Sequence, residues 1–311
     1  MIIKAPIDLE LTQNSGQTSQ PPWKLDNNIY SDVVVADNKA VLFQVKQKEN
    51  NLDFNFIGDI SNKEATKKIK TIFDLDFNLN KFYKYLNNQP ELADMTNFCR
   101  DLRLFLAKDK FECVISSVCS ANNSIARWTK SIDDIKKSWG NKYIYSEKDY
   151  FTFPDVSDFK NIYCDDVEEF ECCSNLNNPG ECINNLKSCG VGYRAPYMKK
   201  ASEIFTLEMD LDDISKMSYD EAFDTMLKVP GVGPKVADCI LLYGFNFRQA
   251  FPTDVWIKRI VSYLYFDGKD INVSKIREFG MEEFGDYAGY VQLYLFHYAR
   301  MSGLMKKLKG M

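Results

Sequence analysis

The stretch VPGVGPKVADC, residues 229 to 239, restricts the fold more than any other part of the sequence. Two prolines and two glycines stand within five positions, between two segments with helical spacing. The first helix is expected to end near Lys228, and Pro234 suits the first position of the second helix. Free backbone amides at a helix start bind anions, and Gly231 and Gly233 can take positive φ and let a phosphate come close. The sequence therefore predicts a helix, a phosphate-binding hairpin and a helix.

A plainer interpretation of this stretch is a turn between two packed helices, and Lys235 weighs against it. Its ammonium would lie near the positive end of the second helix dipole, which is expected to lower its pKa. A lysine with a lowered pKa can act as a nucleophile. The sequence has a single histidine, His297, so lysine and carboxylate chemistry are better candidates than a relay between serine or cysteine and histidine.

The composition allows an ordinary globular protein and gives no global sign of nucleic-acid binding. The chain has 311 residues, 45% of them hydrophobic, which suffices for two domains or one large domain. Its net charge is −5, so any contact with DNA has to come from local geometry. No apolar run reaches the roughly 18 residues of a membrane span, and the N-terminus lacks the features of a signal peptide. We expect an intracellular protein, in the cytoplasm or nucleoid of a bacterium or in a eukaryotic nucleus.

Two regions with different patterns divide the chain. Residues 31–59 contain β-branched and aromatic runs with turn-prone breaks, which predict three antiparallel strands. From about residue 94 onward the spacing is helical. The predicted fold class is α+β, with an N-terminal antiparallel β domain at 1–93 and an all-helical region at 94–311. Within the second region, residues 163–188 form a cysteine-rich, loop-like insertion.

The hairpin stretch, together with FPTDVW at residues 251–256, resembles the helix-hairpin-helix DNA glycosylases, and within them the 8-oxoguanine DNA glycosylase branch. The resemblance implies that Lys235 attacks C1′ of the damaged nucleotide, expels the base and forms a Schiff base that can lead to strand cleavage. It implies that Asp254 stabilises positive charge on the sugar. The position of Asp254 also predicts a helix N-cap. Trp256 corresponds to a phosphate contact in relatives, and a buried aromatic side chain is the alternative.

The same resemblance assigns a pocket for an extruded base. Cys239, one turn after Lys235, would pack on one side of the base, and Phe296 on the other. Gln292 would bind the edge of the base. The alternative for YAGYVQLYLFHYA is an amphipathic helix with Phe296 in the core and Gln292 on the surface. Gly16, in NSGQTSQPPW, would accept the N7 hydrogen of 8-oxoguanine through its carbonyl, although SQPPW replaces the Phe-Arg-Trp that usually follows.

Two further segments resemble those that contact the strand opposite the damage. VCSANNSIARW implies that Asn122 fills the vacated stack and that Arg127 binds the opposite cytosine. CGVGYRAPY implies that Tyr193 wedges into the duplex and that Arg194 also binds cytosine. Each motif is short, but all of them occur in the order of the family.

The cysteines mark where the chain departs from the family. Nine cysteines without an export signal favour reduced thiols. Zinc binding within the insertion is the alternative, although no C-x-x-C pair is present. Its candidate ligands are Cys164, Cys172, Cys173, Cys182 and Cys189. No cysteine follows Cys239, which disfavours the iron-sulfur branch that includes endonuclease III.

The predicted function is a bifunctional glycosylase and lyase that excises 8-oxoguanine opposite cytosine in base excision repair. Its partner would be double-stranded DNA containing oxidised guanine, and a monomer is expected. No cofactor is required, and a monovalent or divalent cation at the hairpin would be held by the carbonyls of Leu227, Val229 and Val232. The alternatives are a glycosylase for alkylated purines and a non-catalytic helix-hairpin-helix DNA-binding protein.

Overall fold

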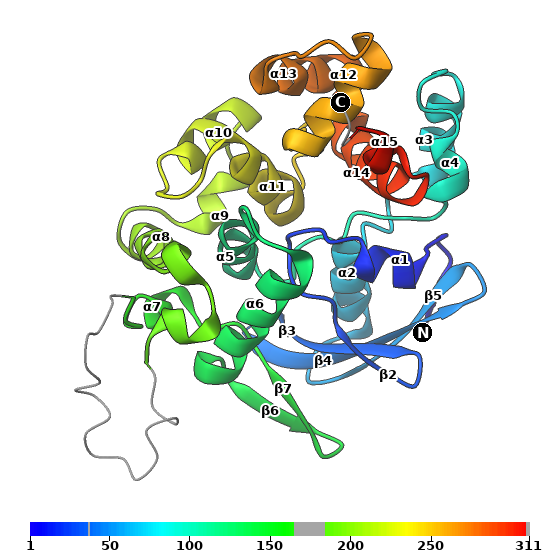
Figure 1. Cartoon of the computed structure of the whole chain (residues 1–311). Coiled ribbons are helices and arrows are strands. Elements are labelled where there is room, and N and C mark those ends of the chain that lie inside the picture. Colours follow the sequence, from blue (N-terminus) through cyan, green and yellow to red (C-terminus); the bar gives the residue numbers. More distant parts are fainter. Residues whose placement is uncertain (37, 165–183, 309–311) are drawn as a thin grey trace.

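The N-terminal part of the chain forms a five-stranded antiparallel sheet with strand order β1-β5-β4-β3-β2 (Figure 1). The computed structural model describes residues 1–36, 38–164 and 184–308. The strands are β1 (Ile2–Ile3), β2 (Lys24–Asp26), β3 (Ile29–Ala36), β4 (Lys39–Lys48) and β5 (Asn51–Ile57). The three predicted strands are present as β3, β4 and β5, and two short strands extend the sheet at its edges. The predicted α+β class is confirmed.

Helix α2 (Asn62–Ile72) covers the apolar side of this sheet. Ser61 and Glu64 form a capping box at its start, each bonding the backbone N–H of the other. Ala65, Ile69 and Ile72 recur at helical spacing and are fully buried in the core shared with the strands. This packing gives the sheet its own hydrophobic core.

Helices make up most of the rest of the described chain. They are α1 (Leu9–Asn14), α3 (Leu79–Asn87), α4 (Met95–Phe98), α5 (Lys110–Ser120), α6 (Ile125–Trp139), α7 (Val156–Phe159), η2 (Leu186–Cys189), η3 (Gly192–Arg194), α8 (Ala195–Leu207), α9 (Leu211–Ile214), α10 (Tyr219–Leu227), α11 (Pro234–Phe245), α12 (Val255–Tyr265), α13 (Val273–Phe284), η4 (Gly285–Tyr287), α14 (Ala288–Met301) and α15 (Leu304–Leu308). Side chains on both sides of the predicted boundary at 93/94, Leu92 and Met95, enter one helical core. The boundary itself stays a prediction.

A two-stranded hairpin interrupts the helical region, where only helical spacing was predicted. Its strands are β6 (Lys142–Tyr145) and β7 (Lys148–Phe151). Tyr150 is buried against Val33 and Leu42 of the N-terminal sheet. The turn residues Ser146 and Glu147 both have positive φ, a geometry that usually carries asparagine and glycine. The sequence therefore lacked the usual signal for this hairpin.

A buried cluster of four charged side chains joins the sheet to the helices. Asp32 of β3 is ion-paired with Lys108, which precedes α5, and with Lys136 of α6, whose Nζ lies 3.3 Å from the carboxylate. Glu112 of α5 lies 3.7 Å from the Lys108 ammonium and 4.0 Å from that of Lys136. None of the four side chains is more than 9% exposed. Two lysines and two carboxyl groups thus face one another, and buried charges are usually paired in this way.

The electrostatics of this cluster favour the ionised form of Asp32. Burial alone would raise the pKa of Asp32, but the charges of Lys108 and Lys136 outweigh it and lower the pKa. For Glu112 burial prevails and raises the pKa above its ordinary value. Asp32 is therefore the anion on which the two lysines depend.

The described cysteines are buried inside the helical region. Cys99, Cys113, Cys119, Cys189 and Cys239 are buried thiols outside any disulfide, and Cys164 is also buried. Cys172, Cys173 and Cys182, with most of the predicted insertion, lie outside the described residues. Within the described chain no three histidine, cysteine or acidic side chains are placed to hold a metal ion. None of its helices combines the length and apolar character that crossing a membrane requires.

We predict that Asp32→Ala lowers the free energy of unfolding by about 3–5 kcal/mol, because it leaves two buried lysines opposite one carboxylate. Urea denaturation followed by circular dichroism measures the effect. Asp59→Ala is the matched control, because its partner Lys39 and Asp59 itself are solvent-exposed. Equal urea midpoints for the two variants would contradict a structural role of the cluster.

Candidate active site

The predicted hairpin lies between α10 and α11. Helix α10 starts with a capping box of Ser218 and Glu221 and ends at Leu227, with Lys228 as its C-cap, and α11 begins at Pro234. Gly231 has φ +82°, as predicted for a phosphate-binding turn. Gly233 does not have positive φ: its φ of −92° and ψ of 179° are extended. It is the N-cap of α11, a position that needs extended backbone. Apart from its two chain neighbours, no residue in the described part of the chain has an atom within 4 Å of the site where a Cβ on Gly233 would stand.

Buried polar contacts fix the orientation of α11. Asp238 is fully buried, and its carboxylate accepts a hydrogen bond of 2.7 Å from Nε of Arg277 on α13. The same carboxylate accepts a hydrogen bond from the hydroxyl of Tyr219 on α10. Three helices are therefore locked together one turn after Lys235.

The first turn of α11 opens on a small pocket that contains the predicted nucleophile. The pocket has a volume of about 70 Å³. Its lining residues are Ser15, Gly16, Gln17, Thr18, Lys235, Cys239, Tyr243, Pro252, Asp254, Gln292, Leu293 and Phe296. The structure thus brings together six residues predicted from four separate segments. Asp254 is also the predicted N-cap of α12, since its carboxylate accepts a bond of 2.8 Å from the Ile257 N–H.

The surroundings of Lys235 raise its pKa above the ordinary value, so the predicted lowering is wrong. Burial alone would lower the pKa, but the interactions with the Cys239 sulfur, including a hydrogen bond, and with the Asp254 carboxylate outweigh burial. Burial also raises the pKa of Cys239. The helix dipole contributes about 1 kcal/mol or less at an exposed site, which is smaller than the effect of a nearby opposite charge. Lys235 is therefore an ammonium in the free protein.

The far wall of the pocket is formed by α14. Gln292 is 9% exposed, and its Oε1 has no hydrogen-bond partner among the described residues. The alternative of a surface position for Gln292 is therefore wrong. Phe296 is half-buried, and the guanidinium carbon of Arg300 lies 5.7 Å from its ring centroid. A buried unpaired oxygen is costly, which makes Gln292 Oε1 a ready acceptor for a ligand N–H.

The near wall of the pocket is an N-terminal loop held by buried glutamines. Gln17 accepts a bond of 2.8 Å from the Phe105 N–H and donates one of 3.0 Å to the Arg103 carbonyl. Gln20 donates to the Leu106 carbonyl at 2.8 Å. Gly16 has φ +83° within this loop. The segment SQPPW differs from the sequence that usually follows in the family. Within it, Gln20 accepts a hydrogen bond from the Trp23 indole N–H, and this bond stabilises the segment.

Sequence reasoning missed half of the pocket lining. Tyr243 is four residues after Cys239 and therefore lies on the same helix face, which could have predicted its place in the pocket. Thr18 and Leu293 are each within two residues of a predicted site residue. Ser15 and Gln17 flank Gly16, and Pro252 precedes Asp254 by two residues, so nearness to a predicted residue was a signal for these three as well.

The residues predicted for the opposite strand lie outside this pocket. Asn122 and Arg127 are exposed, and Asn122 has φ +52°. Tyr193 is 60% exposed. Arg194 is only 8% exposed, and four of its five N–H donors bond the carbonyls of Ala121, Asn122 and Val191. In this state Arg194 supports the turn that carries Asn122 and has one donor left for a base.

The remaining predicted positions flank the hairpin. Trp256 is half-buried on α12, and the guanidinium carbon of Arg259 lies 5.4 Å from its ring centroid. The Val229 carbonyl accepts a bond of 3.0 Å from the Val232 N–H. A carbonyl oxygen has two lone pairs, so this bond is compatible with a cation at Val229.

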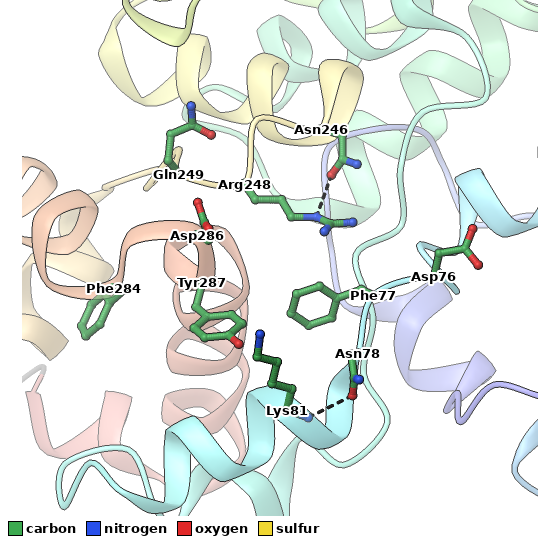
Figure 2. A pocket seen from close by; sticks show the side chains of 10 residues that line it. All are labelled: Asp76, Phe77, Asn78, Lys81, Asn246, Arg248, Gln249, Phe284, Asp286 and Tyr287. Carbon is green, nitrogen blue, oxygen red and sulfur yellow. Dashed lines mark hydrogen bonds between the residues drawn. The ribbon is translucent and has the colours of Figure 1, made fainter.

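A larger cavity of about 800 Å³ lies at the other end of α11 (Figure 2). Its lining residues are Asp76, Phe77, Asn78, Lys81, Asn246, Arg248, Gln249, Phe284, Asp286 and Tyr287. Arg248 stacks on Phe77 and bonds Asn246, and its second partner is the buried Asp74. None of the predicted site residues lines this cavity, so its size does not make it the candidate active site.

Two protein families match consecutive parts of the chain. Residues 1–114 match the N-terminal domain of 8-oxoguanine DNA glycosylase. Residues 115–285 match the HhH-GPD superfamily of base excision DNA repair proteins. The second match ends before Gln292 and Phe296, so it does not include the far wall of the pocket.

Individual proteins match the chain over nearly its whole length. A probable N-glycosylase/DNA lyase of Methanothermobacter thermautotrophicus is 43% identical over 97% of this chain and 96% of its own. The 8-oxoguanine glycosylase/lyase of Clostridium acetobutylicum, solved with DNA containing cytosine opposite 8-oxoguanine, is 28% identical with a TM-score of 0.78, and the match covers 97% of this chain and 98% of that one. The 3-methyladenine DNA glycosylase of Archaeoglobus fulgidus shares the fold, with 20% identity, a TM-score of 0.77 and the same coverage.

Proposed function

This chain belongs to the HhH-GPD superfamily of base excision DNA repair proteins as an N-glycosylase/DNA lyase, and we propose that it excises 8-oxoguanine that faces cytosine in duplex DNA. The observation that carries the proposal is the meeting of Lys235, Cys239, Asp254 and Gln292 in one pocket. A nucleophile, a carboxylate and a group for the base edge are thus all present. The N-terminal family match and the Clostridium acetobutylicum relative support 8-oxoguanine as the substrate.

The proposed chemistry begins with transfer of a proton from the Lys235 ammonium to water, and the departing base later takes up a proton from water. The nitrogen lone pair then forms a bond to C1′, and the electrons of the glycosidic bond leave with the base. The developing positive charge on the sugar is stabilised by the Asp254 carboxylate, which lines the same pocket. Opening of the sugar ring gives a Schiff base on Lys235, from which loss of a C2′ proton and of the 3′ phosphate cleaves the strand.

The pocket walls supply the groups that an extruded 8-oxoguanine requires. The Gly16 carbonyl would accept the N7 hydrogen that guanine lacks, and Gln292 would bind the base edge. Cys239 and Phe296 would lie on the two faces of the base. Ligand pockets usually measure about 300–1,000 Å³, so the 70 Å³ pocket has to widen when the base enters. We expect Phe296, which is only half-buried, to be the wall side chain that moves aside.

The proposed contacts on the opposite strand come from the exposed residues outside the pocket. Arg127 would bind cytosine with a guanidinium that lies exposed on α6. Asn122 would fill the gap in the stack, and Tyr193 would wedge beside it. Arg194 would use its one remaining N–H donor or release a backbone carbonyl to reach cytosine.

Backbone amides of the hairpin would bind the DNA phosphates, which explains how a chain of net charge −5 holds DNA. Gly231, Gly233 and Trp256 are the proposed phosphate-contact positions. A cation held by the carbonyls of Leu227, Val229 and Val232 would add positive charge at this point. The proposed reaction needs no cofactor and no iron-sulfur cluster, since Lys235 supplies the nucleophile, and a monomer suffices for it.

We predict fastest base release from 8-oxoguanine opposite cytosine in a panel of duplexes that varies the lesion and the opposite base. Lys235→Gln should lower this rate by a factor on the order of 10³ or more, because the nucleophile is lost. Single-turnover assays on labelled duplexes measure base release. Lys84→Gln is the matched control, since Lys84 is exposed on α3. Preferential release of alkylated purines would contradict the proposed specificity and show a glycosylase for alkylated bases. Tight binding without release of any base would indicate a non-catalytic DNA-binding protein.

The raised pKa of Lys235 predicts a rate that keeps rising with pH. Only the neutral amine attacks, and below the pKa its fraction grows about tenfold for each pH unit. We expect the logarithm of the single-turnover rate to rise with a slope near one from about pH 6 to 9, after correction for binding and for cleavage without protein. A plateau near pH 7 would show a lowered pKa and contradict the charge state assigned to Lys235.

A further inference from the structure

Tyr197, a residue to which the proposed function gives no role, lies directly against the hairpin. It belongs to the first turn of α8 and is 39% exposed. A Cβ on Gly231 would stand 2.7 Å from Cγ and 2.8 Å from Cβ and Cδ2 of Tyr197. Gly231 is therefore required for its positive φ and also because no side chain fits between the hairpin and the ring.

The Tyr197 ring also meets the predicted wedge, Tyr193. The ring centroids of Tyr193 and Tyr197 are 6.5 Å apart, with an interplanar angle of 84°. This edge-to-face arrangement is favourable for aromatic pairs. Tyr193 is largely exposed, so the contact with Tyr197 restricts a ring that otherwise projects into solvent.

The contacts continue from Tyr193 to the turn that carries Asn122. The Arg194 guanidinium carbon lies 4.5 Å from the Tyr193 ring centroid. Arg194 Nη2 donates to the Ala121 carbonyl at 2.6 Å and to the Asn122 carbonyl at 3.1 Å. An unbroken series of contacts thus joins Gly231 to Asn122 through Tyr197, Tyr193 and Arg194.

We propose that Tyr197 is a positioning residue that fixes the distance between the phosphate-binding hairpin and the wedge Tyr193. When the hairpin holds the backbone, Tyr193 then stands at a set place along the duplex. Tyr197 thereby assists extrusion of the base, while phosphate binding and the attack by Lys235 do not depend on it. The inference rests on the proposed function for the roles of the hairpin and the wedge.

The first test measures unstacking of DNA separately from chemistry. A duplex with 2-aminopurine beside 8-oxoguanine gains fluorescence when the neighbouring bases unstack. We expect Tyr197→Ala to bind this duplex within about twofold of the unmodified protein but to unstack it and excise the base about three- to tenfold more slowly. Tyr197→Phe keeps the ring contacts and should restore both rates. Phe98→Ala is the matched control, since it removes a ring that is 43% exposed on α4 and packs on Tyr298.

The second test separates positioning from a general loss of structure. Extrusion costs less when the damaged base is unpaired, as it is opposite an abasic site. On such a duplex the excision rate of Tyr197→Ala should therefore lie within about twofold of that of the unmodified protein. A general structural defect would slow excision from both duplexes equally.

The outcomes distinguish this inference from the proposed function. Unmodified protein that unstacks DNA but excises no base, with Tyr197→Ala failing to unstack it, would refute the proposed function and support the inference. Tyr197→Ala that unstacks and excises at unmodified rates would overturn the inference. The inference would also be overturned if Tyr197→Ala slowed excision equally from duplexes with paired and with unpaired 8-oxoguanine. Failure of Tyr197→Phe to restore the rates of unstacking and excision would overturn it as well.

Discussion

A lysine that stays charged inside a small pocket is the constraint on which the rest of this structure depends. Removing an ion from water costs several kcal/mol unless an opposite charge lies close to it. Asp254 provides that charge because it is the N-cap of α12, whose first turn it holds through the Ile257 N–H. The starts of α11 and α12 must therefore meet at one pocket. The same charge that stabilises Lys235 before the reaction would stabilise the sugar cation during it.

Buried polar contacts in the surrounding frame keep those two helix starts together. Asp238 ties α11 to α10 and α13. Asp74, which follows α2, accepts a bond of 2.8 Å from Tyr290 and so ties the N-terminal part to α14. Asp32 joins the sheet to α5 and α6. The carboxylates of Asp238, Asp74 and Asp32 all have protein partners, whereas Gln292 Oε1, which belongs to the pocket lining, has none among the described residues. A buried acceptor that lines a pocket and has no protein partner is available to a ligand.

Local sequence patterns were sufficient to predict the parts of the site that are local in the chain. The spacing of Lys235 and Cys239 on one helix face, and the N-cap at Asp254, follow from short-range geometry. The direction of the Lys235 pKa shift could not be predicted in this way, because it is the balance of burial, the neighbouring Cys239 and a carboxylate at the start of another helix. Arg194 bonds a carbonyl 73 residues away, and no pattern along the chain indicates such a contact. The hairpin at 142–151 was missed because its turn lacks the residues that usually mark one.

The central claim is that the Lys235 amine forms the covalent bond to the sugar, and mapping that bond tests it most directly. Borohydride reduces a Schiff base to a stable amine, so the protein can be joined to 8-oxoguanine DNA, digested and analysed by mass spectrometry. We expect the sugar fragment on the peptide that contains Lys235. An adduct on another lysine or on the N-terminal amine would contradict the assignment, and so would its persistence in Lys235→Gln.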